Sequence, residues 1–353
     1  MPVSPRITLE EIARAAKVSV ATASRAINKT GRVSADAERR VRSATMRLGA
    51  ERQRAGRTRI LCFLLANRPM LHPFHAQVLM GAQAYAAEHG NHILFFPFDY
   101  GPDVPAEEIR LPLLLDRRGL VDGYVVGGLS SPNLLALLRR MGLPFAVLAN
   151  NVLGEWRSEE FDTVWMDDVG GAYELTRYLY GAGHRAIWFL SNRRFPTARM
   201  YQGYARAMEE AGLEPKLIVS DSADERDSGY IAAKGLLSGR ERVTAIFAHS
   251  DSAAHGAYDA AGGCGLKIPE DISIAGFGDR PEAAALSPPL ITVWGYPDQT
   301  GRRLAELVLK RIADPGGPPM TVTLPTKLIR RDSCGRAKEE APPALTGDLT
   351  ASA

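Results

Sequence analysis

The chain has 353 residues, of which 45% are hydrophobic and 24% charged, and its formal net charge is +3. These values are ordinary for a globular protein and argue against a disordered or fibrous chain. No apolar run reaches membrane-spanning length and the N-terminal residues lack a signal-peptide core, so we expect a cytoplasmic protein with no membrane partner. Cys62, Cys264 and Cys334 lie far apart without metal-ligand spacing, which favours a reduced compartment and predicts neither disulfide nor zinc site.

The charge is unevenly distributed along the chain. Residues 1–60 carry fourteen Lys and Arg residues against five acidic ones, a net charge of +9, which leaves about −6 for the remainder. A basic N-terminal segment on a mildly acidic body predicts a polyanionic partner for that segment alone.

The segment Ile7–Asn28 contains two short amphipathic stretches that meet at Lys17–Ser19. Thr8 and Ser19 are suited to cap the two helices, and Ser34 to cap a third that runs through Leu48. The second stretch is rich in small and hydroxyl residues, which is typical of a recognition helix that enters the DNA major groove. The first is expected to pack inward Leu9, Ile12, Ala13 and Ala16. The pattern predicts a helix-turn-helix DNA-binding domain over residues 1–48.

Residues 49–59 are basic and nearly devoid of apolar groups, which predicts a hinge or linker. From residue 60 short apolar runs alternate with helical stretches. Continuous apolar runs indicate strands buried on both faces of parallel sheets, and the alternation indicates doubly wound α/β lobes. The expected strands are Ile60–Leu65, Ile93–Phe96, Gly123–Val126, Phe145–Leu148, Ala186–Leu190, Leu217–Val219, Ala245–Phe247 and Ile272–Gly276. The expected helices include Ala76–His89, Leu134–Met141, Ala172–Tyr180, Met200–Ala211 and Ala253–Gly262.

Eight strands are many for one sheet of this kind, so we expect two lobes within residues 60–335. Asn151–Asp162 and Pro288–Pro297 are the expected crossings between them. The first lobe is assigned about residues 60–156 and 293–318, and the second about 157–290 and 320–332. Residues 336–353 are rich in Pro, Ala and acids and are expected to form a disordered tail.

The chain resembles the lactose/galactose repressor (LacI/GalR) family of bacterial regulators over about residues 7–335. The head carries Thr8-Leu9-x-x-Ile12-Ala13, Val18-Ser19-x-x-Thr22-x-Ser24-Arg25-x-x-Asn28 and Val33-Ser34. The body carries Val121-Asp122-Gly123, Gly183-His184-Arg185, Ser250-Asp251-Ser252-Ala253-Ala254-x-Gly256-Ala257, Ile268-Pro269-Glu270-Asp271-Ile272-Ser273, Gly276-Phe277, Ser287-Pro288-Pro289-Leu290 and Leu324-Pro325-Thr326-x-Leu328. The resemblance implies a DNA-binding head, a hinge, and a periplasmic-binding-protein-like body that dimerises and binds a small effector, often a sugar.

The resemblance implies roles for the head residues. Val20, Ala21 and Arg25 are where family members reach base edges, and the guanidinium of Arg25 suits bidentate readout of guanine. The alternative is that Arg25 is a solvated surface cation. The residues placed to bond phosphates are Thr8, Ser19, Thr22, Ser24, Asn28 and Ser34. One head supplies few contacts, so we expect a dimer on a near-palindromic operator in double-stranded DNA.

The hinge departs from the family pattern. Family members usually follow Leu-Gly with a Tyr, a Pro-Asn, and a helix whose leucine is wedged into the central minor groove, whereas residues 50–59 offer only Ala50 and Ala55 as apolar side chains. We expect Arg52 and Arg54, with Arg57 and Arg59, to contact phosphates or a narrow minor groove, with little kinking. A flexible, solvated linker is an equal alternative.

Effector sites in such bodies lie at the carboxyl ends of the strands, where the lobes converge. From the first lobe, Phe74, His75, Ser130 and Asn150 are the candidate effector-binding residues; Phe74 could equally be a core residue. From the second lobe and the return crossing the candidates are Arg199, Ser250, Asp251, Asp279 and Trp294. Asp251 could instead cap the following helix. Two positions where members often carry a carboxylate are Ala149 and Gly278 here, so the pocket has fewer anchors for sugar hydroxyls and Trp294 is expected to stack on the ligand.

These residues predict a DNA-binding transcriptional regulator, a repressor, controlled by a sugar or related metabolite in the cleft between lobes. The direction of control, induction or co-repression, is left open. An enzyme is one alternative, but the sequence has no GxSxG elbow, no Walker loop and no GxGxxG after a strand. A small-molecule sensor without sequence-specific DNA binding is another. No cofactor or metal is expected.

Overall fold

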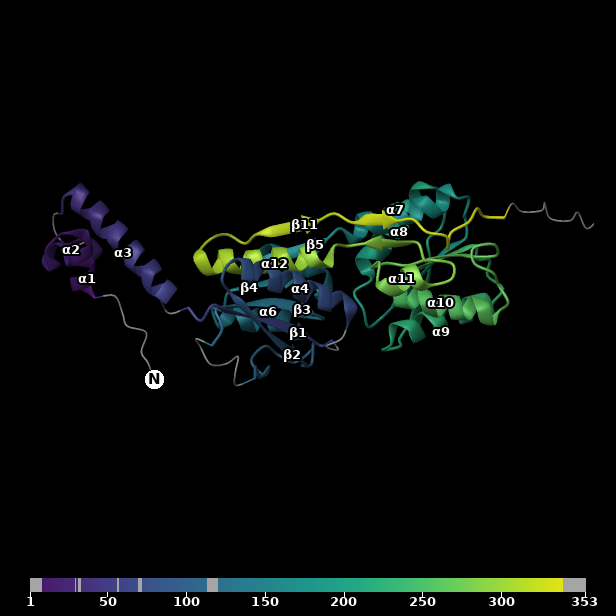
Figure 1. Ribbon diagram of the computed structural model, residues 1–353, viewed down its shortest axis with the longest axis horizontal. Helices are drawn as coiled ribbons and strands as arrows, with labels where there is room; N and C mark the ends of the chain where they lie inside the picture. Colours follow the sequence, from purple (N-terminus) through teal and green to yellow (C-terminus); the bar gives the residue numbers. More distant parts are fainter. Residues whose placement is uncertain are drawn as a thin grey trace, which may run out of the picture. The chain divides into compact units, whose positions relative to one another are not determined.

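The computed structural model describes residues 8–28, 30, 33–55, 57–68, 72–112 and 120–338. The chain divides into two compact units, Met1–Ile60 with Leu111–Asp122, and Leu61–Arg110 with Gly123–Ala353. Figure 1 shows the first as a group of helices and the second as an α/β body. Among the described residues, no helix is both long and apolar enough to cross a membrane.

The first unit contains α1 (Leu9–Ala16), α2 (Val20–Asn28) and α3 (Ala35–Ala55). Thr8 caps α1 in a capping box with Glu11, and Lys17 ends the helix in the left-handed conformation, which turns the chain into α2. The small core between the helices consists of Ile12, Ala13, Ala16, Ala23, Val41 and Ala44. Leu9 was expected in this core but is 38% exposed, because it is the first residue of α1 and lies outside the helix packing.

Helix α3 continues to Ala55, well beyond Leu48, so most of the segment expected to be an irregular linker is helical. The following residues are held by Asp122, whose carboxylate accepts hydrogen bonds from the backbone N–H groups of Thr58 and Arg59 at 2.9 Å. These two hydrogen bonds hold the end of the basic segment in place just before β1. Where the domain boundary lies within it stays a prediction.

The first lobe of the body is built on a six-stranded sheet in the order β11-β5-β4-β3-β1-β2. Its strands are β1 (Ile60–Ala66), β2 (His92–Phe98), β3 (Gly123–Gly128), β4 (Phe145–Leu148), β5 (Thr163–Met166) and β11 (Thr321–Leu324). The pairs β1–β3, β3–β4, β4–β5 and β5–β11 are parallel. The helices are α4 (Pro73–Glu88), α6 (Pro132–Arg140) and α12 (Pro297–Ala313), and short 3₁₀ turns lie at Ala149–Asn151 and Ser158–Glu160.

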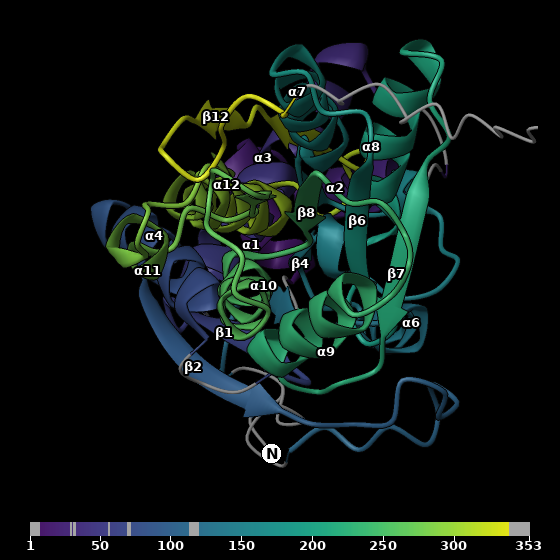
Figure 2. The same ribbon diagram turned by 90° about the vertical axis from the view of Figure 1, so that its right-hand side faces the viewer.

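The second lobe is built on a parallel sheet in the order β7-β6-β8-β9. Its elements are β6 (Ile187–Asn192), β7 (Lys216–Ser220), β8 (Ala245–Ala248), β9 (Ser273–Ala275), α7 (Asp168–Gly181), α8 (Ala198–Glu210), α9 (Glu225–Leu237), α10 (Asp251–Gly263) and α11 (Pro281–Ala285). Leu190 and Ile246 face a core with α9 and α10, whereas Phe189 and Phe247 face a core with α7 and α8, so helices cover both faces (Figure 2). A small antiparallel ladder, β10 (Thr292–Trp294) with β12 (Lys327–Ile329), completes the lobe.

The described chain passes between the lobes at three places, after β5, after β10 and after β11. The assignment of residues 157–166 and 321–324 to the second lobe was therefore wrong, because β5 and β11 pair with each other at the edge of the first sheet. The third crossing lies between Leu324 and Lys327, later than the boundary at about residue 319 that the lobe assignment implied. The expected tail also begins later than residue 336, because Ala337 donates a backbone hydrogen bond to Ala182; its part beyond Lys338 lies outside the described residues.

Candidate functional site

A cavity of about 130 Å³ lies between the two lobes of the body. It is lined by residues that follow the carboxyl ends of strands, among them Arg68 after β1, Asn150 after β4 and Ser250 after β8. This is the edge at which open parallel sheets bind ligands. Much of the wall is apolar and is formed by Phe74, Met166, Phe195, Met200 and Phe277.

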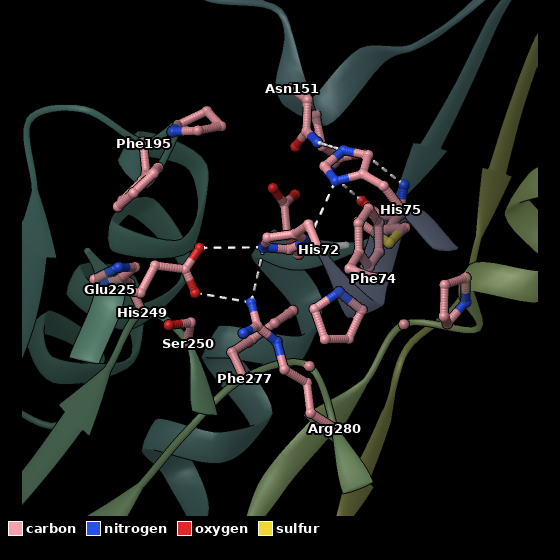
Figure 3. A pocket seen from close by; sticks show the side chains of 18 of the residues that line it. His72, Phe74, His75, Asn151, Phe195, Glu225, His249, Ser250, Phe277 and Arg280 are labelled. Atoms are coloured by element: carbon pink, nitrogen blue, oxygen red, sulfur yellow. Dashed lines mark hydrogen bonds and ion pairs between the residues drawn. The ribbon is translucent and has the colours of Figure 1, made fainter. Parts of the chain in front are cut away.

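Glu225, the first residue of α9, forms the polar centre of the cavity (Figure 3). Its carboxylate accepts a hydrogen bond from Arg280 Nη2 at 2.8 Å and lies 3.4 Å from His72 Nε2 and 3.6 Å from Arg68 Nη2. Although burial opposes ionisation, the His72 hydrogen bond and the Arg280 charge hold the pKa of Glu225 well below its usual range. Arg68 and His72 belong to the first lobe and Glu225 and Arg280 to the second, so this cluster connects the lobes.

Three polar side chains of the first lobe extend from Glu225 as a chain of contacts (Figure 3). His72 Nδ1 lies 3.3 Å from His75 Nδ1, and His75 Nε2 lies 3.1 Å from Asn151 Nδ2. Burial lowers the pKa of both histidines, so each is neutral at pH 7. His72 Nε2 lies 3.1 Å from Arg280 Nη2, which can only donate, and 3.4 Å from Glu225, which can only accept, so the tautomer of His72 decides which of the two it bonds.

Arg280 is fixed by Asp251, which lies behind the cavity wall. The Asp251 carboxylate accepts hydrogen bonds from the Arg280 backbone N–H at 2.7 Å and from Thr292 Oγ1 at 2.5 Å. Asp251 is fully buried, and this burial raises its pKa to about 6. The Arg280 side chain is also held by Ser252, whose Oγ accepts from Nη1 at 2.7 Å.

Two buried polar atoms of residues that line the cavity, His249 Nε2 and Arg68 Nε, have no hydrogen-bond partner among the residues that the structure describes. His249 is 5% exposed, and its Nδ1 lies 3.2 Å from the Leu190 carbonyl oxygen, so Nδ1 carries the proton and Nε2 is a free acceptor. The second atom is Arg68 Nε, a donor; the Arg68 guanidinium lies over the Phe195 ring at 4.4 Å.

In the N-terminal unit, α2 presents Val20, Ala21 and Arg25 as exposed side chains, and Val20 is 45% exposed despite being apolar. Arg25 Nε donates to the Ala21 carbonyl at 3.1 Å, which holds the guanidinium along the helix. Ser19 Oγ accepts from the Thr22 N–H at 3.1 Å and so caps α2. The described residues contain no group of three or more His, Cys, Asp or Glu side chains that could hold a metal ion.

Comparison with known proteins gives the same two parts. Residues 8–49 match the model described as "Bacterial regulatory proteins, lacI family", and residues 176–334 match "Periplasmic binding protein-like domain". The HTH-type transcriptional repressor CytR of Escherichia coli K12 is 30% identical over 86% of this chain and 89% of its own length. The chain belongs to the lacI family.

Two further comparisons cover nearly the whole of this LacI-family regulator. The ribose operon repressor of Haemophilus influenzae is 30% identical over 92% of this chain and 98% of its own. The solved structure of the transcriptional regulator CelR in complex with cellobiose is 28% identical, covers 93% of this chain and 100% of its own, and superposes with a TM-score of 0.69. The chain is thus a DNA-binding transcriptional regulator with a helix-turn-helix head and a periplasmic-binding-protein-like α/β body.

The cavity contains four of the nine predicted effector-binding residues, Phe74, His75, Asn150 and Ser250. Asn150 is nevertheless held by the backbone, because its amide donates to the Met166 carbonyl at 2.9 Å and accepts from the Met166 N–H at 2.7 Å. Ser250 caps α10 through the Ala253 N–H. Asp251 is the first residue of α10 and acts as neither cap nor lining residue.

The other four predicted residues also lie outside the cavity lining. The Arg199 guanidinium pairs at 2.8 Å with Asp168, which does line the cavity, and lies over the Trp165 ring at 4.5 Å. Asp279 is turned toward Arg331, with which it pairs at 2.6 Å. The remaining two are held by local structure: Ser130 is 1% exposed and forms a backbone bridge with residue 152, and Trp294 lies in the β10–β12 ladder.

Most of the ionisable groups that line the cavity were not predicted from the sequence, among them Arg68, His72, Asp168, Glu225 and Arg280. His72 lies two residues before the candidate Phe74, and Arg280 directly follows the candidate Asp279. Their position next to those candidates was the available signal. Glu225 had no such signal, because α9 itself was not predicted.

For the head, the predicted capping roles of Thr8, Ser19 and Ser34 are confirmed. The predicted DNA contacts are not tested by the structure of the protein alone. Ser24 is half-buried within α2. Asn28, Arg52 and Arg54 lie in α2 and α3, but their side chains are outside the described residues.

Proposed function

We propose that this LacI-family regulator represses transcription by binding a near-palindromic operator as a dimer, and that a small effector in the interlobe cavity changes its affinity for DNA. The effector is a sugar or related metabolite. The protein acts in the cytoplasm and is not an enzyme. Whether the effector releases or promotes DNA binding is decided by which lobe arrangement it stabilises.

The observation that carries this proposal is the polar cluster formed by residues of both lobes. Arg68 and His72 of the first lobe contact Glu225 of the second, so a movement of the lobes apart would break these contacts, and a ligand that binds them would interact differently with the two arrangements. Such a difference in affinity is what couples a ligand to a conformational change. The CelR structure, which contains cellobiose, supports a sugar-sized ligand in a body of this fold.

The head supports sequence-specific DNA binding. Val20, Ala21 and Arg25 are exposed on one short helix, and Arg25 is the one of these that can hydrogen-bond a base pair. We infer that Arg25 reads guanine, that Val20 and Ala21 make apolar contacts, and that hydroxyl residues around them bond phosphates. The arginines of residues 52–59 add electrostatic affinity.

Dimerisation is supported by exposed apolar side chains on both lobes. Met80 on α4 is 67% exposed, and Ile231 on α9 is 57% exposed with Tyr230 beside it at 41%. We expect these side chains to be buried in the dimer, because large apolar groups at one interface stabilise association. If the dimer interface includes both lobes, a change in the relative position of the lobes changes the interface.

The test is selection of bound duplexes from a random DNA library by the purified full-length chain. The expected result is enrichment of a near-palindromic site, with log K falling steeply as log salt rises, about 0.9 per phosphate neutralised. Failure to enrich any sequence, with weak and sequence-independent binding, would instead indicate a sensor without specific DNA recognition.

A further inference from the structure

We propose that the effector is an anion: it carries a carboxylate or phosphate that binds Arg68 and Arg280, and a hydroxyl or N–H that donates to His249 Nε2. This inference rests on the proposed function, since it assumes that the interlobe cavity is the effector site. It adds the chemical class of the ligand.

The cavity is lined by two guanidinium groups and by one carboxylate that is not paired elsewhere. Arg68 and Arg280 are cations with side chains only 12% exposed, and Glu225 is the carboxylate that lies between them. The other lining carboxylate, Asp168, is already paired with Arg199 at 2.8 Å. Glu282 lies 3.9 Å from Arg280 Nη1, but it is 37% exposed and is not part of the lining.

The histidines of the site do not change this count. Burial lowers the pKa of His72, His75 and His249, so all three are neutral at pH 7. Asp251, behind the wall, has a pKa of about 6 and is therefore ionised at pH 7, which offsets the charge of Arg280. Arg68 is left with a contact to Glu225, whose carboxylate Arg280 and His72 also contact, so an anion beside Arg68 stabilises its charge in a largely buried site.

Arg68 is the guanidinium with the poorest partners. Its distance to Glu225 is 3.6 Å, too long for a hydrogen bond, and its Nε has no partner. Stacking on Phe195 holds the planar group at the cavity wall. A carboxylate or phosphate suits this position because it accepts two parallel hydrogen bonds from a guanidinium.

The free acceptor on His249 specifies a second ligand group. Because Nδ1 donates to Leu190, Nε2 can be satisfied only by a donor, and the ring is held against Phe195 with a centroid separation of 5.8 Å. A ligand hydroxyl or N–H meets this need. The cavity of about 130 Å³ between Phe74, Phe195 and Phe277 then favours a compact carbon skeleton. A neutral polyol can donate to His249 and accept one hydrogen bond from Arg68, but it brings no negative charge and no second parallel acceptor for the guanidinium.

The experiment measures binding to the full-length protein by thermal shift and calorimetry, at constant ionic strength in a buffer without phosphate or carboxylates. The probes are matched pairs that differ in the anionic group: D-glycerate and glycerol 3-phosphate against glycerol, D-gluconate against D-glucitol, and D-glucuronate against D-glucose. We expect at least one anionic probe to bind ten-fold or more tightly than its neutral counterpart. The glycerate and glycerol 3-phosphate arms distinguish carboxylate from phosphate. Equal or tighter binding of the neutral members, or no binding by any anionic probe, would overturn the proposal.

Variants then test the named residues with the anionic probe that binds best. Arg68→Met keeps an apolar chain against Phe195. It is expected to weaken binding of that probe ten-fold or more without weakening binding of the neutral counterpart. Arg68→Lys keeps the charge and should restore part of the loss, which also guards against misfolding of the methionine variant. His249→Phe keeps an aromatic ring against Phe195 but removes the Nε2 acceptor. Binding of the probe should weaken, because the hydroxyl of the probe loses its hydrogen-bond partner. Arg194→Met is the matched control, because Arg194 is exposed, pairs with Asp221 and is absent from the cavity lining.

Measurements of DNA binding with the same protein preparations distinguish failure of the anion proposal from failure of the proposed function. If a neutral sugar changes operator affinity and no anion does, the anion proposal fails while the proposed function stands. If no duplex is bound specifically, the proposed function itself fails.

Discussion

Asp251 and Arg280 are joined by a hydrogen bond of 2.7 Å from the Arg280 backbone N–H to the Asp251 carboxylate. The second carboxylate oxygen accepts from Thr292 Oγ1. A residue that the sequence suggested as a ligand contact thus positions the loop that carries a cationic side chain into the cavity. Buried polar groups of this kind contribute to stability mainly because removing one leaves its partners without a hydrogen bond.

We predict that Asp251→Ala lowers the free energy of unfolding by about 1–3 kcal/mol, because the Arg280 N–H and the Thr292 hydroxyl lose their shared acceptor. Urea denaturation of the full-length chain, followed by far-UV circular dichroism, measures the change. Asp259→Ala is the control, because Asp259 forms an exposed pair with Arg226, and such pairs contribute about 0–1 kcal/mol. A loss no larger than that of the control would contradict the role given to Asp251.

The three cavity histidines predict that stability falls as the pH drops below about 6.5. Their pKa values are lowered by burial in the folded state, so below that pH the unfolded chain binds more protons. Each proton of difference changes the free energy of unfolding by about 1.4 kcal/mol per pH unit. Asp251 and Asp168 act in the opposite direction, because burial raises their pKa values, that of Asp251 to about 6, and lets the folded state take up protons first. Burial also lowers the pKa of His184, and four histidines outweigh two carboxylates, so the net change is a loss.

Thermal unfolding between pH 7.5 and 5 tests this prediction. The variant His75→Asn should flatten the dependence, whereas His92→Asn, at an exposed position of β2, should leave it unchanged. A stability that is constant or rises toward pH 5 in the wild-type protein would show that the histidines are not held neutral.

The sequence predicted most strands of both sheets, because strands buried on both faces are short continuous apolar runs, but it missed β5 although that strand is largely buried. Phe145–Leu148 was placed at its observed bounds. β11 was missed because its residues at an edge alternate between exposed and half-buried, and α9 because small and polar residues dominate its sequence. Both elements are defined by what they pack against rather than by their own pattern.

The site was harder to predict than the fold. Phe74 and His75 were found because they follow the first strand, and strand ends converge in a parallel sheet. Glu225 and Arg280 are far apart in the sequence and meet only because α9 and the loop after β9 reach the same edge. Arg199 was assigned to the ligand, but a neighbouring carboxylate takes its charge. Such pairing is a tertiary property that no local motif encodes.

Asn150 gives a prediction that separates structural from ligand-binding roles. Because both ends of its amide bond the Met166 backbone, Asn150→Ala should destabilise the body by about 1–3 kcal/mol. In the folded protein at low temperature it should weaken effector binding far less than Arg68→Met does. Calorimetry and urea denaturation on the same samples measure both effects. A large loss of affinity without a loss of stability would assign Asn150 to the ligand instead.

Arg25→Ala tests direct readout by the head. If Arg25 bonds guanine in a fork, the variant should lose about 1–3 kcal/mol, or about 5- to 150-fold, for the selected operator and should tolerate changes at that base pair. Arg39→Ala removes the same charge from an exposed position of α3 and should weaken all duplexes alike. Equal effects of the two variants on operator and random DNA would leave Arg25 as a solvated cation.

Gly229 and Gly235, both on α9, are expected to respond in opposite ways to replacement by alanine. α9 and α10 pack so closely that a Cβ on Gly229 would overlap the Ala253 carbonyl, and one on Gly256 would overlap the Arg226 carbonyl. Gly235, also on α9, has open space around its Cβ position. Gly229→Ala should therefore destabilise the protein by about 1–3 kcal/mol through overpacking.

Gly235→Ala should stabilise the protein by up to about 1 kcal/mol, because alanine loses less backbone entropy than glycine when a helix forms. Urea midpoints of the two variants, measured against the wild type, give both signs in one experiment. If Gly229→Ala were as stable as Gly235→Ala, the helices would have to separate readily. Glu225 and Asp251, which hold Arg280, are the first residues of α9 and α10. A separation of the two helices would therefore also displace Arg280. In that case the affinity for the effector should fall while the stability stays unchanged.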